Sequence, residues 1–151
     1  KKLAESGRFT FLKDTCCDPG MINEKLRAVD GMGLKIFNAN SASLLETLKM
    51  GCAGFSGVMA NFHPEIYSWL CKNFKKEPEK AKKVQAFLGF ASLAECQVYP
   101  VNAKYYLSLE GVPMGCDCRS KDASAFTLSR RMEIEQMREL TEQFKADMGI
   151  E

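Results

Sequence analysis

The segment RFTFLKDTCC, at residues 8–17, joins an apolar run to a charged end. Phe11 and Leu12 lie in a run without helical spacing, which predicts a buried β-strand over residues 8–13. That strand ends in Lys13, and α/β proteins bind their ligands at the carboxyl ends of the strands. The lysine is therefore either an accident of the surface or the functional reason for the strand.

Strands and helices alternate through the part of the chain that contains this segment. After the first strand, Asp18 offers an N-cap oxygen and Pro19 suits the first position of a helix. Two more strands are predicted, LKIFNAN at residues 34–40 and one within CAGFSGVMAN at residues 52–61. Apolar residues at helical spacing follow each strand: Met21, Ile22, Leu26 and Val29; Leu44, Leu45, Leu48 and Met50; and Ile66, Trp69, Leu70 and Phe74. This order predicts βαβ units and an α/β protein with a parallel sheet.

The second of these helices has signals at both ends. Ser43 and Glu46 have the spacing of a capping box at its start, and Gly51 ends it. The three strands together cannot close a barrel, and an open parallel sheet leaves unpaired edges and an uncovered face. We therefore expect this sheet to be part of something larger.

The second half of the chain has no strand pattern. Helices are predicted at about 79–97, about 100–110 and about 124–148, and the last has the stripe of an ordinary amphipathic helix. The lysine-rich run KNFKKEPEKAKK, at residues 72–83, is typical of a solvated junction between helices. This half is therefore predicted to be helical.

The composition indicates a globular protein without a strong charge. The chain has 151 residues and a formal net charge of +2, which gives no support for a nucleic-acid or membrane surface as partner. No apolar run approaches the roughly 18 residues of a bilayer-spanning helix. We therefore predict no nucleic-acid partner and no membrane partner.

The chain has seven cysteines, an odd number at irregular spacings. A disulfide framework is more often even-numbered and found in shorter chains, so we predict reduced thiols and a cytoplasmic location. Neither Cys16-Cys17 nor Cys116-x-Cys118 has the C-x₂₋₄-C spacing of structural zinc, and His63 is the single histidine. We predict no metal site, and a thiol-based redox or metal protein is the alternative that the cysteine pairs leave open.

Lys13 at a strand end suits covalent chemistry on carbonyl groups. A lysine that apolar neighbours desolvate loses part of its preference for the charged form, and its neutral amine forms a Schiff base with a carbonyl compound. The protonated imine stabilises a carbanion at the adjacent carbon, so C–C bonds are made and broken with no metal and no other cofactor. The alternative is a lysine whose ammonium group extends to water from the end of the strand.

Small and polar residues end the other two strands. Asn38, Ala39 and Asn40 end the second strand, just before a helix N-terminus whose N–H groups attract anions such as a carboxylate. Ser56 ends the third strand beside Gly57, and a glycine lets the backbone approach a ligand closely. Next to a lysine, the residues at these two strand ends suit the binding of a small oxo acid. The alternative is that they are ordinary turn residues.

The segments FLKDT (11–15), FNAN (37–40) and GCAGFSGVMANFHPE (51–65) resemble the second half of the dihydrodipicolinate synthase / N-acetylneuraminate lyase family. The resemblance extends across essentially the whole chain, including YPVNAKYYLSLEG at residues 99–111. Members of this family are class I aldolase-type enzymes on a (β/α)₈ TIM barrel. The resemblance implies that the chain is the C-terminal part of such a barrel, with β/α units 6–8 at residues 1–75 and a C-terminal helical region of the same domain at residues 76–151.

The resemblance also implies roles for individual residues. Lys13 matches the lysine that forms a Schiff base with pyruvate or a related 2-oxo acid, and Asp14–Cys16 would help to shape the site. Ala39 stands where the family usually has a glycine that contacts the substrate, and Ser56 matches a position whose backbone carbonyl lies near it. We therefore expect Lys13 to be catalytic and the substrate-binding set to comprise Thr15, Asn38, Ala39, Asn40 and Ser56.

The same resemblance predicts what the chain lacks. Strands one to five, which carry a Thr-Thr or Ser-Thr motif and a proton-relaying tyrosine, are absent, so we expect the C-terminal part of a roughly 300-residue enzyme. We expect this part to be inactive alone, and to belong to a homo-oligomer that acts on a 2-oxo acid and an aldehyde, whose identity stays open. The alternative is a non-catalytic half-barrel whose open sheet pairs with another copy.

Overall fold

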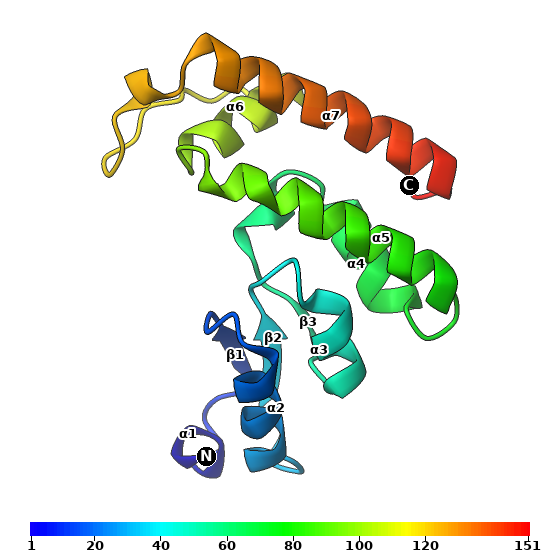
Figure 1. Cartoon of the computed structure of the whole chain (residues 1–151). Coiled ribbons are helices and arrows are strands. Elements are labelled where there is room, and N and C mark those ends of the chain that lie inside the picture. Colours follow the sequence, from blue (N-terminus) through cyan, green and yellow to red (C-terminus); the bar gives the residue numbers. More distant parts are fainter.

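The computed structural model describes residues 1–151 and contains one parallel sheet (Figure 1). Its strands, in spatial order, are β1 (Phe11–Asp14), β2 (Lys35–Asn38) and β3 (Gly54–Phe55). Leu12 pairs with Ile36, and Phe37 pairs with Gly54. The predicted α/β fold with three parallel strands is therefore confirmed.

Helices lie before, between and after the strands. Helix α1 (Lys2–Glu5) precedes β1, α2 (Pro19–Ala28) and α3 (Leu44–Met50) connect the strands, and the 3₁₀ helix η1 (Val58–Asn61) and α4 (Pro64–Asn73) follow β3. The start of α2 is as predicted, because the Asp18 side chain accepts a hydrogen bond of 2.9 Å from the N–H of Met21. The end of α3 is also as predicted, because Gly51 has a φ of 117°, in the region that favours glycine.

The start of α3 differs from the predicted capping box. Ser43 precedes the helix, but its side chain makes no capping bond to it. Instead, Asn40 Oδ1 accepts hydrogen bonds from the N–H and the hydroxyl of Ser43, at 3.0 and 3.1 Å. An asparagine earlier in the turn therefore organises this helix start, since its short side chain bonds to the nearby backbone.

The strands are shorter and the first is less buried than predicted. The strand predicted at residues 8–13 begins only at Phe11, which is 51% exposed. Ile36 on the other face is buried against Ile22 of α2, whereas Phe11 and Phe37 stack on each other, with centroids 4.4 Å apart, on a face that no helix covers. A strand of this sheet can be buried on both faces only if further elements cover that second face.

The second half of the chain is helical, as predicted. It contains α5 (Pro78–Ala91), the 3₁₀ helix η2 (Ser92–Cys96), α6 (Val101–Leu109), the 3₁₀ helix η3 (Ala123–Ala125) and α7 (Leu128–Met148). The helix predicted at about 79–97 changes to 3₁₀ geometry after Ala91. In Figure 1, α5 and α7 lie beyond the sheet, and Phe87 of α5 stacks on Phe144 of α7 with centroids 4.2 Å apart. One core cluster of buried residues joins α3 and α4 to these helices.

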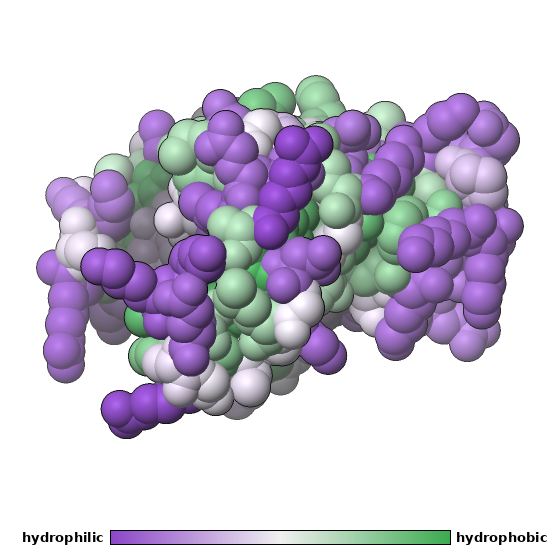
Figure 2. All heavy atoms as spheres, turned by 90° about the horizontal axis from the view of Figure 1, so that it is seen from below, coloured by the Kyte–Doolittle hydropathy of each residue, from purple (hydrophilic) through white to green (hydrophobic).

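Apolar side chains also lie on the surface. Figure 2 views the molecule from the end that carries α1 and α2, and apolar atoms occupy the middle of this face among charged side chains. The large exposed apolar residues of the first 30 positions are Leu3, Phe9, Phe11 and Met21. None of the helices combines the length and the apolar content that a membrane span requires.

Candidate active site

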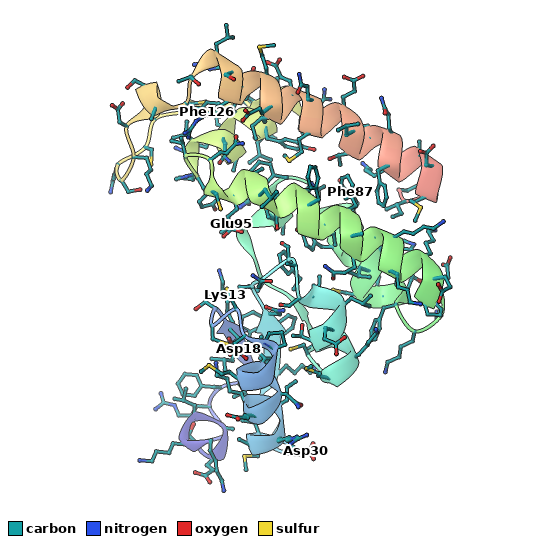
Figure 3. The ribbon with its side chains drawn as sticks, viewed as in Figure 1. Lys13, Asp18, Asp30, Phe87, Glu95 and Phe126 are labelled. Carbon is teal, nitrogen blue, oxygen red and sulfur yellow. The ribbon has the colours of Figure 1, made fainter.

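Lys13 lies at the carboxyl end of β1, beside the loop that leads to Asp18 and α2 (Figure 3). It is in register with Phe37 of β2 and therefore shares the uncovered face of the sheet with the Phe11–Phe37 stack. Lys13 is exposed and takes part in none of the ion pairs or side-chain hydrogen bonds of the structure. An amine at this edge of the sheet is therefore free of competing partners.

Asp14, the next residue, faces the opposite way. Its carboxylate is buried and accepts hydrogen bonds from Lys25 Nζ at 2.5 Å and from the N–H of Cys16 at 2.9 Å. Burial raises the pKa of Asp14, but the bonds from Cys16 and Lys25 outweigh it and leave this pKa below its usual value. Asp14 thus ties β1 to α2 and does not face the side that carries Lys13.

Thr15 and Cys16 begin the loop after β1. Thr15 is exposed, and its carbonyl accepts a hydrogen bond from the Cys17 thiol at 3.6 Å. Cys16 is half-buried, and its N–H belongs to the turn that Asp14 organises. The hydroxyl of Thr15 makes no hydrogen bond within the protein. It is the first such side-chain group in the loop that follows Lys13.

Asn38, at the end of β2, uses its side chain to hold the following turn. It is fully buried, and its Nδ2 donates to Thr47 Oγ1 at 2.9 Å and to Ser43 Oγ at 3.0 Å. Its Oδ1 accepts from the N–H of Asn40 at 2.7 Å. The amide of Asn38 is therefore committed to the protein, and any contribution that it makes to a bound molecule is through the shape of the turn.

The turns after β2 and β3 come into close contact. The N–H of Ala39 donates to the carbonyl of Asp14 at 2.9 Å, and the N–H of Ser56 donates to the carbonyl of Asn38 at 2.8 Å. A Cβ atom at Gly57 would lie only 2.3 Å from the carbonyl oxygen of Ala39, so this contact requires glycine. The ends of all three strands, with Lys13, Ala39 and Ser56, therefore meet at one edge of the sheet.

Two residues from the helices hold the turn after β2, and the sequence reasoning missed both. Gln85 of α5 bonds to the backbone of Ser41, Ala42 and Leu45, and the hydroxyl groups of Tyr67 and Ser41 lie 2.7 Å apart. One signal was present for Gln85, because it occupies a place in the buried stripe formed by Ala81, Val84 and Leu88. A polar residue at such a place indicates a specific partner, but the sequence does not show which one.

Comparisons with known proteins agree with this geometry. Residues 1–141 match the model of the Dihydrodipicolinate synthetase family. YagE, a prophage protein of the dihydrodipicolinic acid synthase family from E. coli K12 in complex with pyruvate, is 22% identical, with a TM-score of 0.78 over 96% of this chain and 49% of that chain. The 4-hydroxy-tetrahydrodipicolinate synthase from Methylacidiphilum fumariolicum SolV is 19% identical, with a TM-score of 0.75 over 93% of this chain and 47% of that chain.

A third solved structure gives the same result. The chloride-inhibited dihydrodipicolinate synthase from Acinetobacter baumannii, complexed with pyruvate, is 20% identical, with a TM-score of 0.68 over 98% of this chain and 49% of that chain. No curated protein matches the sequence. The chain thus spans about half the length of these solved structures, and the predicted part of a (β/α)₈ barrel is confirmed.

Proposed function

Because the chain belongs to the Dihydrodipicolinate synthetase family, we propose that it carries the reactive lysine of a Schiff-base-forming lyase or aldolase that acts on pyruvate or a related 2-oxo acid. The observation that carries the proposal is the place of Lys13. It stands at the carboxyl end of a parallel strand, on the uncovered face of the sheet, with no partner in the protein. Two of the similar solved structures are complexes with pyruvate, which supports this class of substrate.

The proposed reaction begins at Lys13 Nζ. The neutral amine adds to the keto carbon, a proton moves to the oxygen, and the resulting carbinolamine loses water to form the imine. The protonated imine withdraws electrons from the adjacent carbon, which loses a proton to give an enamine. The enamine attacks an aldehyde in the synthetic direction, and the reverse sequence cleaves the C–C bond.

The neighbouring strand ends would hold the oxo acid. The backbone of Ala39 and Asn40 lies after β2 at the start of a helical turn, and the carbonyl of Ser56 lies after β3. Thr15 supplies a free hydroxyl from the loop after β1. We propose that these groups bind the substrate and that Asn38 shapes their turn.

The open face of the sheet limits what the 151-residue chain does alone. In this chain, water reaches Lys13 and the Phe11–Phe37 stack. Strands of the other half of the barrel would exclude that water and supply further groups for the carboxylate and the proton transfers. We therefore expect the isolated chain to lack efficient catalysis and the completed barrel, in which the remaining strands cover this face, to be active.

Trapping of the imine tests the proposal. The protein used is the completed barrel, in which this chain is joined to the other half of its barrel. It is incubated with pyruvate and reduced with borohydride, and the modified peptide is identified by mass spectrometry. We expect the adduct on Lys13 and its loss in Lys13→Arg. Lys35→Arg is the matched control, because Lys35 lies on the same face at the other end of the sheet, in register with Phe11. An adduct spread over many lysines, or none at Lys13, would exclude the proposed chemistry.

The open sheet favours a second candidate, a non-catalytic half-barrel that associates with another copy of itself. Phe11 on β1 is 51% exposed, and such a face is more stable when covered. In either case we propose a homo-oligomer, which light scattering on the eluted chain tests. All seven cysteines are free thiols, which supports our proposal of a cytoplasmic location.

A further inference from the structure

Gln85 of α5 reaches from the helical half of the chain to the turn after β2. Its Oε1 accepts a hydrogen bond from the N–H of Leu45 at 2.7 Å. Its Nε2 donates to the carbonyl oxygens of Ser41 and Ala42, at 2.9 and 3.0 Å. A glutamine amide has one acceptor oxygen and two donor hydrogens, and in Gln85 all of these groups bond to the turn after β2 or to the first turn of α3.

Tyr67 of α4 holds the same turn from a second side. Its hydroxyl lies 2.7 Å from Ser41 Oγ, and both groups are buried. Its ring stacks on Phe55, the last residue of β3, with centroids 4.0 Å apart and planes within 4° of parallel. Tyr67 thereby sets the turn after β2 relative to the end of β3.

This turn is also tied to the strand that carries Lys13. The N–H of Ala39 donates to the carbonyl of Asp14, which follows Lys13. The close contact of Gly57 with the carbonyl of Ala39 leaves the turn little room to move toward β3. Asn38 and Asn40 bond to this segment from within it, and the side-chain bonds that reach it from other helices come from Tyr67 of α4 and Gln85 of α5.

We infer that Gln85, supported by Tyr67, is a positioning residue for the oxo acid, which holds the Ala39–Ala42 turn at the distance from Lys13 that binding requires. The inference rests on the proposed function, since it names what sets the substrate-binding turn of that site. It gives the C-terminal helical region a role in the site, although no residue of that region forms a hydrogen bond or an ion pair with Lys13. Because Gln85 touches no reacting atom, its loss weakens binding of the oxo acid and leaves the attack by the amine itself unchanged.

The test measures borohydride trapping on Lys13 in the completed barrel at increasing pyruvate concentration. Gln85→Ala removes all three hydrogen bonds, and we expect the half-saturating pyruvate concentration to rise roughly tenfold, with the trapping rate at saturation within about twofold of the wild type. Gln85→Glu keeps the acceptor for Leu45 but turns a carboxylate oxygen toward two carbonyls, so we expect a rise at least as large.

Val84→Ala is the matched control for a merely structural effect. Val84 is fully buried on the same helix, and its truncation destabilises the core without removing a bond to the turn. Hydrogen exchange of the Leu45 amide reports the bond between Gln85 and the start of α3, and we expect faster exchange in Gln85→Ala than in Val84→Ala.

The outcomes separate the two proposals. A wild-type adduct on Lys13 with the same half-saturating concentration in Gln85→Ala, or an equal rise in Val84→Ala, overturns the positioning role and leaves the proposed function standing. Absence of the adduct from the wild type overturns the proposed function and this inference with it. A rise confined to the Gln85 variants supports both.

Discussion

A shift from pH 7.5 to pH 4.5 should destabilise the fold through one buried side chain, His63. This residue precedes α4 and is 1% exposed. Its ring stacks on Tyr67 with centroids 5.5 Å apart and meets Phe87 of α5 nearly edge-on at 5.7 Å. Neither ring nitrogen has a hydrogen-bond partner. Protonation would therefore place an unpaired charge among aromatic rings.

The size of the effect follows from the two pKa values of His63. Burial, with a smaller contribution from Lys145 on α7, lowers the pKa of His63 from 6.5 to about 4 in the folded protein. Between these values the unfolded chain binds more protons than the folded one, so the free energy of unfolding falls as the pH falls. The contribution is fully present above about pH 6.5, and about 2–3 kcal/mol of it is lost at pH 4.5.

Urea unfolding of the wild type and of His63→Phe, at both pH values, measures this contribution. The variant keeps an aromatic ring at the site and has no group that titrates there. We expect the wild type to lose about 2–3 kcal/mol more than the variant between the two conditions. Taking the difference cancels the carboxylates that both proteins share, Asp14 among them. Equal losses in the two proteins would mean that His63 makes no such contribution.

Three substitutions test other parts of the structure. Gly57→Ala brings a Cβ to within 2.3 Å of the turn carbonyl, so urea unfolding should show a loss of roughly 1–3 kcal/mol and imine trapping should fail. Lys25→Met leaves the buried Asp14 carboxylate without its ion pair; because Lys25 is partly exposed, we expect a loss of about 1–2 kcal/mol at pH 7. That loss should shrink in acid, because the pKa of Asp14 is lowered in the folded protein and the stabilisation from its ionised form disappears as the pH falls through that pKa. A destabilisation that is the same at every pH would contradict this account. Asp18→Ala removes the N-cap bond of α2 and should cost about 1 kcal/mol in thermal unfolding, whereas Asp30→Ala, on an exposed turn, should change little.

Much of the layout could be predicted from the sequence because its signals are local. Asp18 and Pro19 mark the start of α2, Gly51 marks the end of α3, and each signal acts within one helical turn. The alternation of strands and helices indicated a parallel sheet, and a parallel sheet brings its strand ends to one edge. The place of Lys13 at that edge is therefore a consequence of the sequence pattern.

Other features depended on contacts between residues far apart in the chain. In place of the capping box predicted at Ser43, the N–H and the hydroxyl of Ser43 donate to Asn40 Oδ1, because the turn after β2 folds against its own backbone. Gln85 bonds to residues 40 to 44 positions away, and no local spacing identifies its partners. The burial of His63 likewise depends on how α4, α5 and α7 pack.

Local patterns in the sequence are enough to indicate which segments form strands and helices, and that Lys13 lies at the end of a strand. The open face of that strand, the direction of the Asp14 carboxylate and the helices that hold the turn beside the lysine follow from the packed fold. This difference reflects the range of the interactions: capping and periodicity act over about four residues, whereas burial and hydrogen bonding across the fold depend on the packing of the whole chain.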